Sequence, residues 1–325
     1  MPGAKLPSPE QVAWQLAHSG DDLGPSVIAA GAISNALGTI FLVFRIWSKK
    51  VLHGRLRLDV NDWLCLTTWP LFISHATVME VATHYGLGRH IVFATNPRVL
   101  EIVCLIVENL YAVEIALLKL SILTLYQQLF KQHGWFYRTT WLVGFFAAAV
   151  GIAIIFVTNL QCIPIAASWD PRIDATCVGY ENFALAAYIV NIVIDLVILT
   201  MPIPCVLKLK LSTHRKWMLI LTFATGGGAC IVSIVQLRYI ARLGNTSDPS
   251  WDNAFVGIVS LFEVMVGILA VSIATYRPLY QHLLAVNSSL KINGDTNGRP
   301  GDPRAKSLCT AQVTVDSRLH SSMAS

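Results

Sequence analysis

Three polar residues inside long apolar segments are the first candidates for chemistry in this sequence. Glu108, Asn191 and Glu263 each stand nine residues from the same-side end of the apolar segment that contains them. At 1.5 Å per helical residue, all three would lie roughly 13 Å below one face of a membrane. Polar groups at such depth are costly and often mark functional sites. We therefore predict either a ligand-binding layer or a structural hydrogen-bond network, and the spacing leaves both open.

Buried carboxyl groups have a second use, as proton donors. A carboxyl that keeps its proton near neutral pH is able to protonate an apolar substrate in a cyclisation or isomerisation. Glu108 and Glu263 are the catalytic candidates if the protein is an enzyme. Lys119 and Asp195 lie deeper, toward the opposite face, and we expect them to form a structural ion pair between helices.

The sequence contains no phosphate-binding loop, nucleophile motif or nucleic-acid signature. His84 and His90 flank a turn, but they lack the third partner that a metal site requires. We accordingly expect no cofactor, no metal and no nucleic-acid partner.

The composition indicates where these polar residues sit. Of the 325 residues, 54% are hydrophobic and only 13% are charged, whereas a soluble domain has about 25% charged residues. A membrane-spanning helix needs about 20 apolar residues. Seven segments of that kind are present, over residues 25–47, 62–82, 99–125, 139–160, 182–207, 217–239 and 254–275.

The predicted fold is therefore an all-α, polytopic bundle of seven transmembrane helices. The bundle domain covers residues 25–282, after a polar extracellular tail at 1–24. The tail at 283–325 is rich in Ser, Asn, Gly and Asp, a composition typical of disorder. We expect a multi-pass protein of the plasma membrane or an endomembrane, whose immediate partner is the lipid bilayer.

The distribution of basic residues predicts the orientation of the chain. The loops after the first, third and fifth segments carry ten Lys and Arg residues, against five in the N-terminal region and the other loops. Because basic loops stay in the cytoplasm, the N-terminus is expected outside and the C-terminus inside.

This orientation places two features on the outer side. Cys162 and Cys177 lie in the loop after the fourth segment, in an oxidising space where disulfides persist. We predict a disulfide between them, with a bridge to Cys104 of the third segment as the alternative. Asn245-Thr246-Ser247 is a glycosylation sequon on another outer loop.

Seven short blocks occur in a recognisable order between Arg45 and Leu279. They are Asn61-Asp62-Trp63, Gly86-Leu87-Gly88-Arg89-His90, Lys119-Leu120-Ser121-Ile122-Leu123, Gln161-Cys162 with Trp169 and Cys177, Asn191-Ile192-Val193-Ile194-Asp195, Pro202-Ile203-Pro204, and Arg277-Pro278-Leu279. Together they resemble the fungal rhodopsin-domain family of integral membrane proteins, which includes satratoxin-cluster-like and Pth-eleven-like proteins. Asn61 and Ala274 depart from the family's usual Asp and Pro. No eight-cysteine CFEM module precedes the bundle.

The resemblance implies a receptor-like protein that senses a small or apolar ligand, with a cytoplasmic signalling partner left open. Retinal is not expected, because residues 254–275 contain no lysine for a Schiff base. Family members also sit in fungal secondary-metabolite gene clusters. The alternative is therefore a membrane-embedded enzyme or an accessory protein of such a pathway.

Overall fold

The computed structural model describes residues 7–53, 58–129, 134–168, 173, 176–177, 180–208, 213–243, 246–273 and 275–276. The predicted cytoplasmic tail at 283–325 lies outside these residues. Over the described part, the chain is almost entirely helical. The α-helices are α1 (Pro9–Ala17), α2 (Gly24–His53), α3 (Val60–His84), α4 (Pro97–Leu129), α5 (Gly134–Asn159), α6 (Tyr180–Thr200), α7 (Ile203–Lys208), α8 (Thr213–Leu243) and α9 (Pro249–Ile273).

Short elements connect some of these helices. The 3-10 turn η1 (Ile91–Phe93) follows α3, and η2 (Ile165–Ser168) follows α5. Strands β1 (Cys162–Ile163) and β2 (Thr176–Cys177) pair antiparallel, with Cys162 opposite Cys177.

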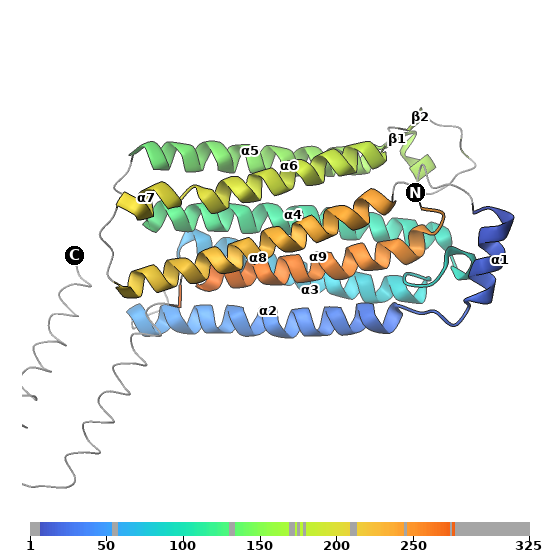
Figure 1. Cartoon of the computed structure of the whole chain (residues 1–325), viewed down its shortest axis with the longest axis horizontal. Helices are drawn as coiled ribbons and strands as arrows, with labels where there is room; N and C mark the ends of the chain where they lie inside the picture. Colours follow the sequence, from blue (N-terminus) through green and yellow to red (C-terminus); the bar gives the residue numbers. More distant parts are fainter. Residues whose placement is uncertain are drawn as a thin grey trace, which may run out of the picture. The chain divides into compact units, whose positions relative to one another are not determined.

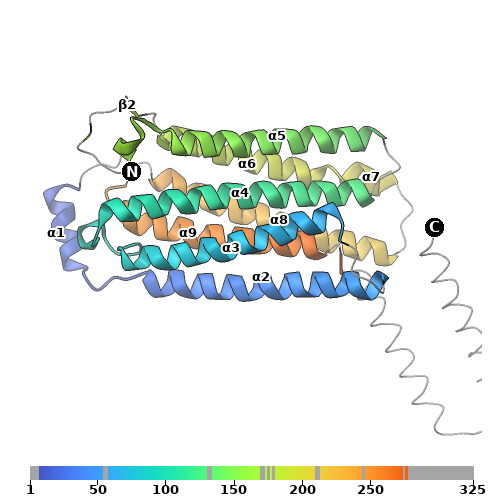
Figure 2. The same cartoon turned by 180° about the vertical axis from the view of Figure 1, so that it is seen from behind.

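The long helices α2, α3, α4, α5, α6, α8 and α9 lie side by side as a bundle (Figures 1 and 2). Helix α4 contacts α3, α5, α6 and α9, so its side chains reach most parts of the bundle interior. Helix α9 contacts α2, α3, α4 and α8. These two helices supply Glu108, Lys119 and Glu263 to the polar clusters described below.

Five segments in the described chain are long and apolar enough to cross a membrane. They are Gly24–Lys50, Gly134–Asn159, Asn182–Cys205, Ala224–Arg242 and Pro249–Ile273. The protein is therefore a membrane protein with several spanning helices. Helices α3 and α4, with 25 and 33 residues, do not belong to these five.

Local sequence signals account for several helix ends. Asp59 is the N-cap of α3, and its backbone N–H donates to Asp62 Oδ2 at 2.9 Å, one half of a capping box. Gly86 and Gly88 follow α3 with φ values of 115° and 87°, a region that side-chain-bearing residues rarely adopt. Helix α6 ends at Thr200, two residues before Pro202, and the chain restarts as α7.

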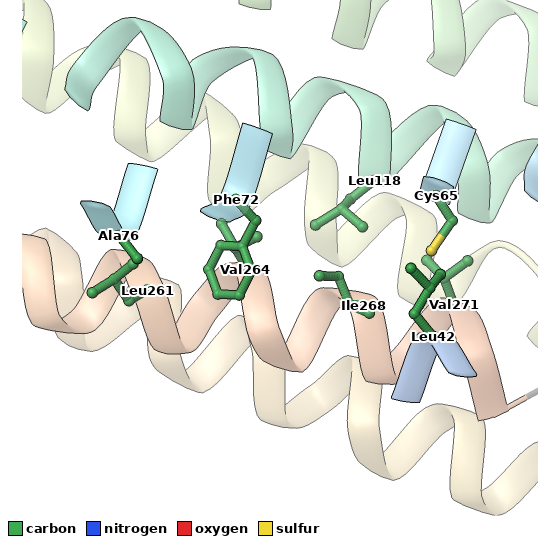
Figure 3. Packing of buried hydrophobic residues seen from close by; sticks show 9 residues of the cluster. All are labelled: Leu42, Cys65, Phe72, Ala76, Leu118, Leu261, Val264, Ile268 and Val271. Carbon is green, nitrogen blue, oxygen red and sulfur yellow. The ribbon is translucent and has the colours of Figure 1, made fainter. Parts of the chain in front are cut away.

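The central apolar core joins α2, α3, α4 and α9. Phe72, Leu118, Leu261, Val264 and Ile268 are all buried and pack together (Figure 3). A Cβ atom at Gly38 of α2 would lie 3.3 Å from Phe72 Cε1, so the glycine lets α2 approach closely. Burying these side chains against one another fixes how α4 and α9 are rotated toward the bundle interior.

The N-terminal region, for which the sequence predicted only a polar tail, contains helix α1 at residues 9–17. Ser8 caps this helix: its Oγ accepts from the Gln11 backbone N–H, and Gln11 Oε1 accepts from the Ser8 N–H. Trp14 of α1 contacts His90 edge-on at 5.4 Å between ring centroids. The capping box was readable in the sequence, but the helix is too short to be stable alone and needs this contact.

Candidate functional site

A cavity of about 120 Å³, here called the outer cavity, lies mainly between α4, α5, α6, α8 and α9. Its wall is largely apolar, with side chains such as Val107, Ile154, Phe183 and Val256. The polar members of the wall are Glu108, Tyr111, Lys119, Thr158, Tyr188, Asn191, Gln236, Asn253 and Ser260. An apolar cavity with a few polar groups is the usual form of a small-molecule site.

The disulfide lies at the end of the bundle where α5 ends and α6 begins (Figure 1). Cys162 and Cys177 are joined in the two-stranded hairpin, as the sequence predicted. Cys104 is a free thiol in the wall of the outer cavity, so the alternative bridge is not formed. Thr158, in the last turn of α5, belongs to the same wall. The bridged loop therefore begins beside the outer cavity.

Lys119 of α4 forms the floor of the outer cavity together with α6. Its Nζ donates to Asn191 O at 3.0 Å and to Asn191 Oδ1 at 2.6 Å. The same nitrogen lies 2.9 Å from Asp195 Oδ1. The ammonium group has three N–H donors, and these three contacts use all of them.

A second cavity of about 70 Å³, here called the inner cavity, lies between α4, α6, α8 and α9. Its wall contains Asp195, Ser233 and Glu263 among mostly apolar residues. Lys119 belongs to the walls of both cavities. The Lys119–Asp195 pair consequently separates the outer cavity from the inner one.

Glu263 of α9 is the centre of a second polar cluster. Its Oε2 accepts from Tyr111 Oη at 2.5 Å, and its Oε1 accepts from Ser233 Oγ. Tyr111 Oη also lies 3.3 Å from Gln236 Oε1, and Gln236 Nε2 donates to Tyr188 Oη at 3.3 Å. This network crosses from the outer cavity, which Tyr188 lines, to the inner cavity, which Glu263 lines.

The structure divides the predicted layer of Glu108, Asn191 and Glu263. Glu108 and Asn191 line the outer cavity, whereas Glu263 lines the inner one and bonds to Tyr111 and Ser233. The three residues therefore line two cavities and not one, and their role in ligand binding stays a prediction. Counting residues from the helix ends estimates only how deep a residue lies along the bundle. Helix rotation and the length of the Lys119 side chain decide which polar groups are in contact.

Residues 44–282 match the fungal rhodopsin domain. This chain belongs to that family. It is 30% identical over 239 residues to a SAT4 family membrane protein of Emericella nidulans, covering 72% of this chain and 61% of that protein. No solved structure matches this chain.

Two further relatives carry more specific names. A polyenoic acids biosynthesis gene cluster protein, Ba17b of Metarhizium anisopliae, is 27% identical over 292 residues, covering 83% of this chain and 76% of that protein. Receptor GIN3 of Arthrobotrys oligospora is 23% identical over 284 residues, covering 84% of this chain and 68% of that protein.

Two buried contacts between ionisable side chains of this fungal rhodopsin domain were not assigned from the sequence. His75 Nδ1 lies 2.9 Å from Glu114 Oε2, and neither side chain is exposed. Arg45 Nη2 lies 2.8 Å from Asp62 Oδ1, and Arg45 Nη1 donates to Val271 O at 2.7 Å. The second pair ties α2, α3 and α9 together at the end opposite the disulfide. Their ionisable types were visible in the sequence, but their partners lie in other helices.

The remaining members of the Glu263 network were also missed. Tyr111, Ser233 and Gln236 are ordinary neutral residues of apolar helices, and no spacing distinguishes them. The predicted glycosylation residue, Asn245, lies outside the described residues. Among the described residues of this fungal rhodopsin domain, no group of three His, Cys, Asp or Glu side chains is arranged to hold a metal ion.

Proposed function

We propose that this protein is a receptor-like, seven-helix membrane protein that senses a small or apolar ligand in the outer cavity, without retinal. The observation that carries the proposal is the outer cavity itself, whose apolar wall includes Glu108 and Asn191. Such a wall favours an apolar molecule, and its few polar groups provide orientation and selectivity. The relative named as a receptor adds support.

Seven spans require α3 and α4 to cross the membrane with the five helices that are apolar enough on their own. At 25 and 33 residues they would measure about 38 and 50 Å, longer than the roughly 30 Å hydrocarbon core. Three of their ionisable side chains, His75, Glu114 and Lys119, are buried and so shielded from lipid. Both helices also pack against other members of the bundle.

The proposed orientation is N-terminus outside and C-terminus inside. It follows the excess of basic residues in the loops after the first, third and fifth spans. The disulfide and the outer cavity would then face the outside, and a signalling partner would meet the opposite end. A reporter fused after Ser325 should be inaccessible to protease added outside intact cells. A reporter that is cleaved there would overturn the orientation.

The alternative is a membrane-embedded enzyme or an accessory protein in secondary metabolism. A relative named for a polyenoic acids gene cluster favours this reading. Glu108 would be the acid nearest to a substrate, since it lines the outer cavity. Glu263 lies in the inner cavity, so the two candidate acids do not face a common substrate space.

Filling the outer cavity tests the receptor proposal. Ala187 lines it, while the neighbouring Ala186 on the same helix is exposed. The readout is the set of transcripts whose levels differ between the wild type and a strain lacking the gene. Expressing Ala186→Phe in that strain should restore wild-type transcript levels, and expressing Ala187→Phe should not. Equal restoration by both variants would contradict the proposal.

Metabolite profiling of the same strains separates the two functions. A receptor predicts that no single reaction step is lost in the deletion strain. A missing product with an accumulated precursor, restored by Ala186→Phe but not by Ala187→Phe, would favour the enzyme.

A further inference from the structure

The floor of the outer cavity carries a hydrogen-bond donor without a partner. Asn191 Nδ2 is buried and makes no hydrogen bond to any described residue. A buried donor left unpaired costs about 1–3 kcal/mol. Asn191 lines the outer cavity and not the inner one, so a molecule in the outer cavity is placed to accept from it.

The direction of this amide is set by Lys119. An ammonium group only donates hydrogen bonds, so the amide atom 2.6 Å from Lys119 Nζ must be the oxygen. The amide nitrogen is then turned away from the lysine. Asp195 holds the same lysine at 2.9 Å, so the α6 residues Asn191 and Asp195 keep it in place. The donor is therefore preorganised by a neighbouring ion pair.

The charges around this donor disfavour a carboxylate. All three N–H groups of Lys119 already have acceptors. An incoming carboxylate would have to displace Asp195, which would strand that buried charge. Glu108 lines the same cavity and would be a second acidic group near the bound carboxylate.

Resting on the proposed ligand-sensing function, we infer that the outer cavity takes a neutral, mainly apolar molecule whose carbonyl, ether or hydroxyl oxygen accepts a hydrogen bond from Asn191 Nδ2. The apolar wall takes the hydrocarbon part of the ligand. The amide selects the oxygen-bearing molecule from a plain hydrocarbon, because only the former satisfies the buried donor.

Four nine-carbon probes test this ligand class: 2-nonanone, nonane, nonanoate and nonylamine. The full chain is placed in lipid nanodiscs, and saturable binding is measured with radiolabelled 2-nonanone after subtraction of empty discs. The other three probes serve as competitors. We expect 2-nonanone to bind about tenfold more tightly than nonane, and more tightly than either charged probe, because one hydrogen bond to a buried donor is gained.

Asn191→Asp removes the donor while keeping an oxygen toward Lys119. This variant should lose the roughly tenfold preference for the ketone over nonane. Thr200→Val is the matched control, since Thr200 lies on the same helix and its hydroxyl donates to Leu196 O and Val197 O of that helix. It should bind all four probes as the wild type does. An unchanged ketone preference in folded Asn191→Asp would overturn the assignment of the donor.

The wild-type ranking alone decides the ligand class, whatever the folding of the variant. Tightest binding of nonanoate, nonylamine or nonane would overturn the inference while leaving a ligand-binding cavity. If no probe binds saturably, but Ala187→Phe still abolishes the response in cells, the ligand class is wrong and the proposed function stands. If no probe binds and Ala187→Phe responds normally, both are wrong.

Discussion

The Lys119 ammonium nitrogen lies 2.9 Å from Asp195 Oδ1, and this pair of α4 and α6 stands between the two cavities. The pair therefore has two roles. It neutralises two charges inside the bundle, and it holds the Asn191 amide at the floor of the outer cavity. Both roles lead to separate measurements.

Loss of one partner should cost more stability than loss of both. Asp195→Ala leaves the buried Lys119 ammonium without its carboxylate, and we expect a loss of about 3–5 kcal/mol. The Lys119→Ala/Asp195→Ala double variant should recover part of this loss, because no charge is stranded. Thermal unfolding of the purified proteins measures both values. If the stability losses of the single variants Asp195→Ala and Lys119→Ala sum to the loss of the double variant, the two groups do not interact.

The two buried acids should affect different steps. Glu108 lines the outer cavity, so Glu108→Gln should weaken ligand binding several-fold and with it the response. Glu263 accepts from Tyr111 and Ser233 at the inner cavity, so Glu263→Gln should keep binding and lose response. Binding in nanodiscs and response in the complemented deletion strain are measured separately. Both variants should fold, since Gln preserves the shape of Glu. Full activity of both would exclude a functional role for either acid.

Cys162 and Cys177 should be recovered as one linked pair. Mass spectrometry of the non-reduced protein is expected to find peptides joined through these two residues and Cys104 as a free thiol. Cys162→Ser with Cys177→Ser should lower stability by roughly 3 kcal/mol, the entropic value for a loop of about 15 residues. A Cys104 linkage would contradict the observed pairing.

Retinal should not form a Schiff base with this protein. Helix α9 contains no lysine, and the Lys119 amine is engaged by Asn191 and Asp195. Protein incubated with retinal should show no visible absorption band that borohydride removes. If such a band appears, its persistence in Lys119→Ala would identify another lysine as the attachment site.

The class of protein and the approximate positions of its long helices could be read from the amino-acid sequence. Long apolar segments and the low fraction of charged residues require a membrane environment, and these properties are local. The disulfide was also predictable, because Cys162 and Cys177 share one short loop. Short-range features of this kind depend on composition and chain separation.

The contacts between buried polar groups, in contrast, depend on how the helices pack in three dimensions. Depths counted from the helix ends placed Glu108, Asn191 and Glu263 in one layer. In the structure, however, Glu263 accepts hydrogen bonds from Tyr111 and Ser233. The reason is that a helix rotates, tilts and ends according to how its apolar side chains pack against neighbours. Packing around Phe72 and Ile268 sets the rotation of α9. The partners of a buried charge are therefore a property of the whole bundle, and no single segment encodes them.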